Sequence, residues 1–230
     1  MSLFAIADTH LSLGTDKPMD IFKGWSGYVD KLRENWESTV SDSDTVVIAG
    51  DISWGMSLEG ALDDFRFIDS LPGQKIILKG NHDYWWTTMR KMETFLNQNE
   101  MNTIRFLHNS TITVGDFAVC GSRGWFFDAE ESADNKVLLR EAGRLRTSIN
   151  LAKETGLEPV VFLHYPPITQ NMVCEEIYNV LLETGVRRCY YGHLHGPSMT
   201  RSINSVRDGI EFALISCDFL AFAPKLVEKF

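Results

Sequence analysis

The sequence has no long hydrophobic run. Its apolar segments are much shorter than the roughly 20 residues that a membrane-spanning helix requires, so we expect no membrane segment. The first segment begins at Leu3, which leaves no room for the basic region, apolar region and cleavage site of a signal peptide. We therefore predict a cytoplasmic protein.

Cysteine is scarce and widely spaced. The chain has four cysteines and no Cys-x-x-Cys pair: Cys120, Cys174, Cys189 and Cys217. This spacing argues against a disulfide framework and against a thiolate zinc site. We expect free, buried thiols in a reducing compartment.

Positive charge is also in short supply. The chain has 22 Lys and Arg against 31 Asp and Glu, a net charge of −9, so we expect no duplex nucleic acid as a partner. Bound divalent cations would restore positive charge locally, which keeps small phosphate esters accessible. The 230 residues contain no Pro/Gly/Ser-rich linker, charge block or repeat, which predicts a single domain over residues 1–230. The sequence does not indicate an oligomeric state.

Five short apolar runs each end in polar residues of the kinds that bind metals. The runs are typical of buried strands and cover Leu3–Ala7, Val46–Ala49, Ile76–Leu78, Val160–Leu163 and Cys189–Tyr191. The polar groups that follow them are Asp8-Thr9-His10, Gly50-Asp51, Gly80-Asn81-His82-Asp83, His164 and Gly192-His193-Leu194-His195. If the strands lie side by side in one sheet, their carboxyl ends place all these groups along one edge. Only His108, of the six histidines, lies outside the pattern.

Helical periodicity alternates with these runs. It predicts helices over residues 28–40, 57–71, 84–97, 135–153 and 171–183, with Ser57 as the cap of the second. Short strands over 104–107, 111–114 and 117–120 predict hairpins and hence a second, partly antiparallel sheet, and strands return over 188–191, 198–206 and 210–216. The simplest α/β architecture that uses all of them has two sheets packed face to face with helices on their outer faces.

Each polar group is ambiguous by itself. Asp8 and His10, like His193 and His195, are two residues apart, so in an extended segment both side chains face the same way. Turn chemistry explains Gly50-Asp51 equally well, and His164 alone could be a satisfied core histidine. Together the groups combine oxygen and imidazole ligands without thiolate, which favours Mn, Fe or Zn over Ca or Mg alone, and seven ligands suit two metals.

The ordered blocks Asp-x-His, Gly-Asp, Gly-Asn-His-Asp, His and Gly-His-x-His resemble those of the calcineurin-like metallophosphoesterase superfamily. The resemblance implies a four-layer αββα sandwich of two mixed β-sheets. It also implies that one metal is held by Asp8, His10 and His195, the second by Asn81, His164 and His193, with Asp51 bridging both and His82 as the non-ligand catalytic histidine. Protein serine/threonine phosphatases of this superfamily follow Gly-Asp with Tyr/Phe-Val-Asp-Arg-Gly. This chain has Ile52-Ser53-Trp54-Gly55 there, so that subfamily is not expected.

The implied function is hydrolysis of small phosphate mono- or diesters, nucleotides among them, by a dinuclear metal centre. Two cations about 3.5–4 Å apart clamp the phosphoryl oxygens and supply a metal-bridging hydroxide for in-line attack. His82, kept protonated by Asp83, would stabilise charge on the phosphoryl group or protonate the leaving oxygen. The alternatives are a nuclease of the same superfamily and a non-catalytic metal-binding scaffold.

Aromatic and basic residues near the blocks are candidates for substrate binding. They are Trp54, Tyr84, Trp85 and Trp86, and a second cluster of Arg123, Trp125, Phe126 and Phe127. Trp54, Tyr84 and Trp85 could stack on a nucleobase and Arg123 could contact a phosphate. The favoured alternative is that the rings only fill the core beneath the loops.

Overall fold

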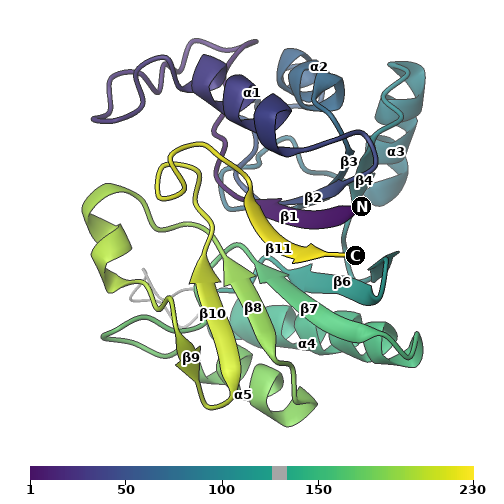
Figure 1. Cartoon of the computed structure of the whole chain (residues 1–230), viewed down its shortest axis with the longest axis vertical. Coiled ribbons are helices and arrows are strands. Elements are labelled where there is room, and N and C mark those ends of the chain that lie inside the picture. Colours follow the sequence, from purple (N-terminus) through teal and green to yellow (C-terminus); the bar gives the residue numbers. More distant parts are fainter. Residues whose placement is uncertain (126–133) are drawn as a thin grey trace.

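The chain folds into two facing β-sheets with helices on both outer faces, as the computed structural model shows for residues 1–125 and 134–230 (Figure 1). Phe126 and Phe127 lie outside the described residues. The predicted four-layer αββα sandwich is confirmed. No helix in the described part of the chain is both long and apolar enough to cross a membrane.

The first sheet has the strand order β11-β1-β2-β3-β4. Its strands are β1 (Ser2–Ile6), β2 (Thr45–Ala49), β3 (Gln74–Leu78), β4 (Ile104–Phe106) and β11 (Lys225–Lys229). β1 to β4 are parallel, and β11 runs antiparallel to β1 at the edge. The outer face is covered by α1 (Tyr28–Thr39), α2 (Leu62–Ser70) and α3 (Met89–Gln98).

The second sheet has the order β5-β6-β7-β8-β10-β9. Its strands are β5 (Ile112–Val114), β6 (Phe117–Ser122), β7 (Glu158–Leu163), β8 (Arg188–Tyr191), β9 (Val206–Arg207) and β10 (Ile210–Leu214). The four central strands are parallel and both edge strands are antiparallel to their neighbours. α4 (Asp134–Glu154) packs against β6, β7 and α5 (Glu175–Thr184), and a 3-10 helix η1 (Gly196–Arg201) follows β8.

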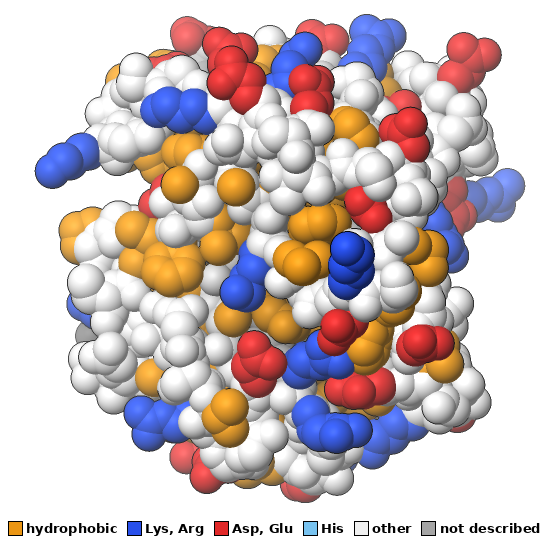
Figure 2. Space-filling view, in the orientation of Figure 1, with side chains coloured by type: hydrophobic (Ala, Val, Ile, Leu, Met, Phe, Trp, Pro, Cys, Tyr) orange, Lys and Arg blue, Asp and Glu red, His pale blue; other side chains and the backbone are white. Residues whose placement is uncertain are grey.

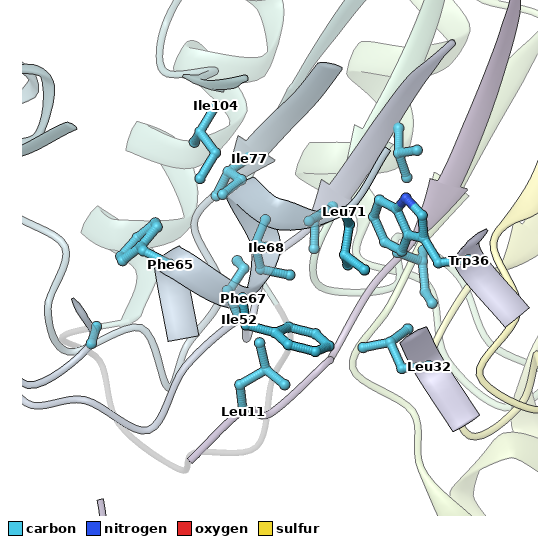
Figure 3. Close-up of a cluster of buried hydrophobic side chains, with 14 of the residues drawn as sticks. Leu11, Leu32, Trp36, Ile52, Phe65, Phe67, Ile68, Leu71, Ile77 and Ile104 are labelled. Atoms are coloured by element: carbon cyan, nitrogen blue, oxygen red, sulfur yellow. The ribbon is translucent and has the colours of Figure 1, made fainter. Parts of the chain in front are cut away.

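Three apolar layers explain why the strand sequences are continuously hydrophobic. In β1, Phe4 and Ile6 face α1 and α2, whereas Leu3 and Ala5 face the second sheet. Buried parallel strands are covered on both faces, so they show no polar alternation. Figure 3 shows the outer layer of the first sheet, where helix residues such as Trp36 and Phe65 pack beneath strand residues such as Ile77.

Three strand predictions were wrong. The five apolar runs do not form one sheet: β1, β2 and β3 lie in the first and β7 and β8 in the second. Residues 104–107 do not join the second sheet, because β4 extends the first sheet in parallel with β3. Residues 198–206 are mostly not a strand, because Gly196-Pro197 opens η1, and Ser198 Oγ accepts a hydrogen bond from His195 N at 2.9 Å.

Two further differences concern element ends. Ser57 does not cap α2; its hydroxyl accepts a bond from Gly60 N at 3.2 Å in a preceding turn, and the helix begins at Leu62 after Ala61. β11 was not expected from the sequence because its Lys225-Leu-Val-Glu-Lys229 segment is short and half exposed at a sheet edge.

Candidate metal centre

The carboxyl ends of strands from both sheets meet at one place. Asp8 N donates to Gly50 O at 2.9 Å, which joins the loops after β1 and β2. His193 N donates to Asp8 Oδ2 at 2.9 Å, which joins the loop after β8 to the first sheet. Figure 2 shows a notch at the left edge of the molecule, on the side where the parallel strands end in Figure 1. The seven predicted ligand residues are therefore brought together, although from two sheets.

One group of ligand atoms consists of Asp8, His10 and His195, whose atoms lie within 4.8 Å of one another. His195 Nε2 is 3.3 Å from Asp8 Oδ1, and His10 Nε2 is 3.8 Å from Asp51 Oδ2. Ligands at about 2.1 Å from one tetrahedral or octahedral ion are about 3.0–3.4 Å apart. The observed spacing is therefore close to what one ion requires.

Two buried atoms in this group have no hydrogen-bond partner among the described residues: Asp8 Oδ1 and His195 Nε2. His195 Nδ1 lies 2.9 Å from Asp218 Oδ1, so a proton on Nδ1 is donated to that carboxylate and Nε2 presents a lone pair. A lone pair and a carboxylate oxygen that face each other in a buried site need a positive charge between them, which either a proton on Nε2 or a metal ion supplies. The residues present therefore fit a metal ion.

The second group surrounds the side-chain oxygen of Asn81. Its Oδ1 is 2.6 Å from His164 Nε2 and 3.0 Å from His193 Nδ1. His164 Nε2 is also 3.5 Å from Asp51 Oδ2, and Asp8, Asp51 and His164 form a second set of close ligand atoms. Because His164 Nδ1 lies 3.1 Å from Ala49 O and can only donate to it, Nε2 is left as an acceptor facing an oxygen. This group too is suited to a cation.

Asp51 lies between the two groups, which is the position of a bridging ligand. Its Oδ2 is 3.8 Å from His10 Nε2 on one side and 3.5 Å from His164 Nε2 on the other. Its other oxygen, Oδ1, accepts a hydrogen bond from His82 N at 2.8 Å, which fixes the carboxylate.

The backbone is strained where the ligands sit. Positive φ angles occur at Asp8 (63°), His10 (43°), Asp51 (52°) and His193 (73°), a conformation that costs energy for residues with a side chain. Gly80 has no room for a side chain, because a Cβ atom there would overlap Asp51 Oδ1 and Asp51 N. The glycine of the Gly-Asn-His-Asp block is thus required by the close approach of the Asp51 carboxylate.

Without a metal ion, protons held by Asp51 and His195 balance the charge in the site. Burial and the neighbouring Asp8 raise the pKa of Asp51 to about 8, because two adjacent carboxylates resist ionising together. Burial opposes protonation of His195, but Asp8 and Asp218 outweigh it and raise its pKa to about 10. Burial lowers the pKa of His10 and of His193 to about 3, which keeps both rings available as neutral ligands. A bound cation would allow both carboxylates to ionise.

The predicted pairing of Asp83 with His82 was wrong. The buried carboxylate of Asp83 accepts five other bonds, from Asp51 N at 2.8 Å, Ile52 N at 2.9 Å, Ser53 N at 3.5 Å, Gly80 N at 2.7 Å and Trp85 Nε1 at 3.0 Å. Asp83 therefore ties the Gly-Asp loop to the Gly-Asn-His-Asp loop.

His82 is also not kept protonated as expected. Burial lowers the pKa of its half-buried imidazole. Its ring lies 4.6 Å from the Trp54 ring and 5.8 Å from the His10 ring, and Tyr84 Oη is 3.4 Å from its Nδ1. A neutral imidazole beside the ligand groups can still donate one hydrogen bond.

The candidate substrate residues separate into different environments. Trp54 stacks on His10 with ring centroids 5.1 Å apart, and Lys17 Nζ lies 4.7 Å from its ring. Tyr84 is 51% exposed, so both it and Trp54 remain available to a substrate. Trp85 is only 2% exposed and packs in the core against Phe65, so the prediction that it binds substrate was wrong.

Of the second cluster, the described residues Arg123 and Trp125 lie next to the loop that carries His164. Arg123 Nη2 is 4.0 Å from a carboxylate oxygen of Glu141, and its guanidinium lies over the Trp125 ring at 4.9 Å. The Arg123 carbonyl accepts bonds from His164 N and Tyr165 N, so the segment is fixed to the ligand loop after β7.

Asp218 and Trp25 belong to the site and were missed in the sequence. Asp218 follows the apolar residues of β10, and its place after a predicted strand was the available signal. Trp25 lies in a loop without periodicity, and its ring packs 5.9 Å from His10 and 5.8 Å from His195. Nothing in the local sequence indicates that contact.

The chain belongs to the calcineurin-like phosphoesterase family, which it matches over residues 1–197. It is 44% identical over 52 residues to the Gene 66 protein of Mycobacterium phage L5, and this match spans 23% of the chain and 25% of the phage protein. The fold is similar to that of a protein of unknown function from Aquifex aeolicus. The TM-score is 0.55 and the sequence identity is 16%, and the match covers 98% of this chain and 95% of the other. A Thermus thermophilus protein matches with a TM-score of 0.59, 11% identity and coverage of 98% and 97%. At these identities the two structures support the fold alone.

Proposed function

We propose that this chain is a single-domain phosphoesterase, spanning residues 1–230, that hydrolyses small phosphate mono- or diesters at a dinuclear metal centre. The observation that carries the proposal is the facing pair of unsatisfied buried atoms, Asp8 Oδ1 and His195 Nε2, beside a second group with the same need for a cation. Membership of the calcineurin-like phosphoesterase family supports the reaction class.

In this proposal the two ligand groups hold one ion each. Asp8, His10 and His195 hold the first ion, Asn81, His164 and His193 hold the second, and Asp51 bridges them. The mixture of imidazole, carboxylate and amide oxygen suits Mn, Fe or Zn. When bound, two such ions clamp phosphoryl oxygens and activate a water molecule.

The protein's own groups then orient the ester and move protons. The neutral His82 ring donates a hydrogen bond to the phosphoryl group, whereas its imidazolium form would protonate the leaving oxygen and return to the neutral ring, a contribution of roughly 10²–10⁴-fold in rate. Asp83 acts as a positioning residue through its bonds to the two loops. Trp54 and Tyr84 form one side of the site, where an aromatic leaving group or nucleobase would stack.

Metal analysis and a substrate screen test this function together. We expect two metal ions per chain, and hydrolysis of simple mono- and diesters such as bis-p-nitrophenyl phosphate in the presence of Mn, Fe or Zn. A folded, metal-loaded chain with no turnover of any ester would favour the binding scaffold instead. Faster cleavage of DNA or RNA than of small esters would favour the nuclease, which the net charge of −9 disfavours.

Two substitutions separate metal binding from proton transfer. We expect His82→Ala to retain both metals but to lose roughly 10²–10⁴-fold in kcat. We expect Asp51→Asn to lose metal as well as activity, because the bridging charge between the two groups is removed. Normal turnover of His82→Ala would exclude the role given to His82, and full metal content in Asp51→Asn would exclude the bridge.

A further inference from the structure

A small, positively charged cavity lies on the other side of the Gly-Asn-His-Asp block. Its volume is about 80 Å³, and it is bordered by the ends of β3 and β6, the loop after β4 and the start of α4. The charged residues that line it are Lys79, Arg123, Arg144 and Glu141. None of them belongs to the two ligand groups described above.

Among the described residues that line this cavity, cationic side chains outnumber carboxylates by two. Three cationic side chains face one carboxylate, that of Glu141, which is buried and bound by Arg144 Nη1 at 2.5 Å. Arg123 Nη2 is farther from Glu141, at 4.0 Å, and Arg123 Nε is buried without a hydrogen-bond partner among the described residues. Among the described residues, no carboxylate oxygen lies within 4.0 Å of Lys79 Nζ. Buried donors without acceptors are costly, so an anion would be stabilised here.

The cavity and the candidate metal centre share two walls. Lys79 is two residues before Asn81, and this places their Cα atoms no more than about 7 Å apart. The carbonyl of Arg123 accepts a hydrogen bond from His164 N at 3.2 Å. The cavity and the candidate metal centre are therefore neighbours in the fold, with Lys79 and Arg123 on the segments that separate them.

We propose that this cavity is a subsite for a second phosphate group of the substrate, in addition to the phosphate at the metal centre. Its excess of two positive charges matches a phosphate monoester dianion, and guanidinium groups bind phosphate oxygens through paired hydrogen bonds. The volume of about 80 Å³ is several times the minimum of roughly 10–15 Å³ that holds one water, so a phosphate group fits. The inference rests on the proposed function and specifies the substrate as an ester that carries two separate phosphate groups.

Counting phosphate sites tests the cavity without any need for turnover. Equilibrium dialysis of the metal-loaded full chain against radiolabelled inorganic phosphate should reveal one site that Arg123→Leu and Lys79→Gln each weaken at least tenfold. Lys79→Gln leaves the Arg123–Glu141–Arg144 cluster intact, so it guards against misfolding. Arg187→Gln is the matched control, because Arg187 is 74% exposed and pairs with Glu158 outside the cavity. Phosphate binding that is the same in all four proteins would overturn the inference.

Kinetics then test whether the bound anion is part of the substrate. With adenosine 3′,5′-bisphosphate and adenosine 5′-monophosphate as substrates, both cavity substitutions should raise the ratio of the KM for the bisphosphate to that for the monophosphate at least tenfold. An unchanged ratio would overturn the substrate subsite even if phosphate binding were lost. A chain that turns over no ester in the substrate screen but loses a phosphate site in Arg123→Leu would contradict the proposed phosphoesterase and support the anion cavity, so the two failures are distinguishable.

Discussion

Replacing Asp218 by Asn should selectively weaken one of the two metals. Asp218 Oδ1 is 2.9 Å from His195 Nδ1, and its Oδ2 accepts a bond from Gly196 N at 3.1 Å. The carboxylate therefore fixes the tautomer of His195 that presents Nε2 to the first ligand group. An amide removes the negative charge and can also donate to Nδ1, which would place the proton on Nε2 and block it as a ligand.

The size of this effect follows from the contact. Removing a carboxylate that holds a ligating histidine typically weakens metal binding by 10–100-fold, which corresponds to about 1.4–2.7 kcal/mol. The second group should be affected less, because Asn81, His164 and His193 make no described hydrogen bond to Asp218. We therefore expect a biphasic metal titration in which one dissociation constant rises 10–100-fold and the other changes little.

Competition with a chelator of known affinity measures both constants in the full chain. Asp208→Asn is a suitable control, because Asp208 also accepts a hydrogen bond, from Tyr178 Oη at 2.7 Å, but contacts no ligand residue. If Asp218→Asn bound both metals as tightly as wild type, the argument that Asp218 orients His195 would be refuted. If both sites weakened equally, the separation into two ligand groups would be wrong.

Two further predictions concern stability. Gly80→Ala should lower both the metal content and the free energy of unfolding, because the added Cβ would overlap Asp51. As a control, the Cβ of Gly143→Ala in α4 meets no atom within 4 Å, so this substitution should raise the free energy of unfolding by roughly 0.5–1 kcal/mol. Equal effects of the two substitutions in chemical denaturation would contradict this steric argument. Lys75→Met should destabilise the fold by about 1–3 kcal/mol, because the buried ammonium donates to the carbonyls of Asp69, Leu71 and Gly73 at the end of α2. Urea unfolding with an unchanged midpoint would show that water satisfies those carbonyls.

The sequence predicts the fold best where local preference and packing agree. Continuous apolar runs such as Val46–Ala49 are buried on both faces, and they were identified as strands correctly. Periodicity also located α1 and α4 to within about a residue of their observed ends. Which sheet each strand joins was not predictable in this way, because a buried parallel strand has the same composition in either sheet.

Side-chain partners were harder to predict than side-chain types. The Gly-Asn-His-Asp block suggested that the Asp83 carboxylate pairs with the neighbouring His82. In the structure it accepts hydrogen bonds from Asp51 N and Trp85 Nε1 instead. Asp218 is 23 residues from His195 and has no distinctive local sequence. Such contacts depend on how loops cross between the sheets, and periodicity carries no information about that.

The candidate ligand blocks stand out in the sequence because chemistry and backbone geometry constrain the same residues. Four of the seven candidate ligand residues adopt positive φ angles, and two adjacent buried carboxylates, Asp8 and Asp51, oppose each other's ionisation. Both features cost stability in the protein alone and are offset only when a cation binds the folded state. The candidate ligands and the glycine that makes room for them therefore stand close together in the sequence, and this makes the blocks recognisable. Strand order and loop contacts have no comparable constraint, since many apolar sequences fill the same layers equally well.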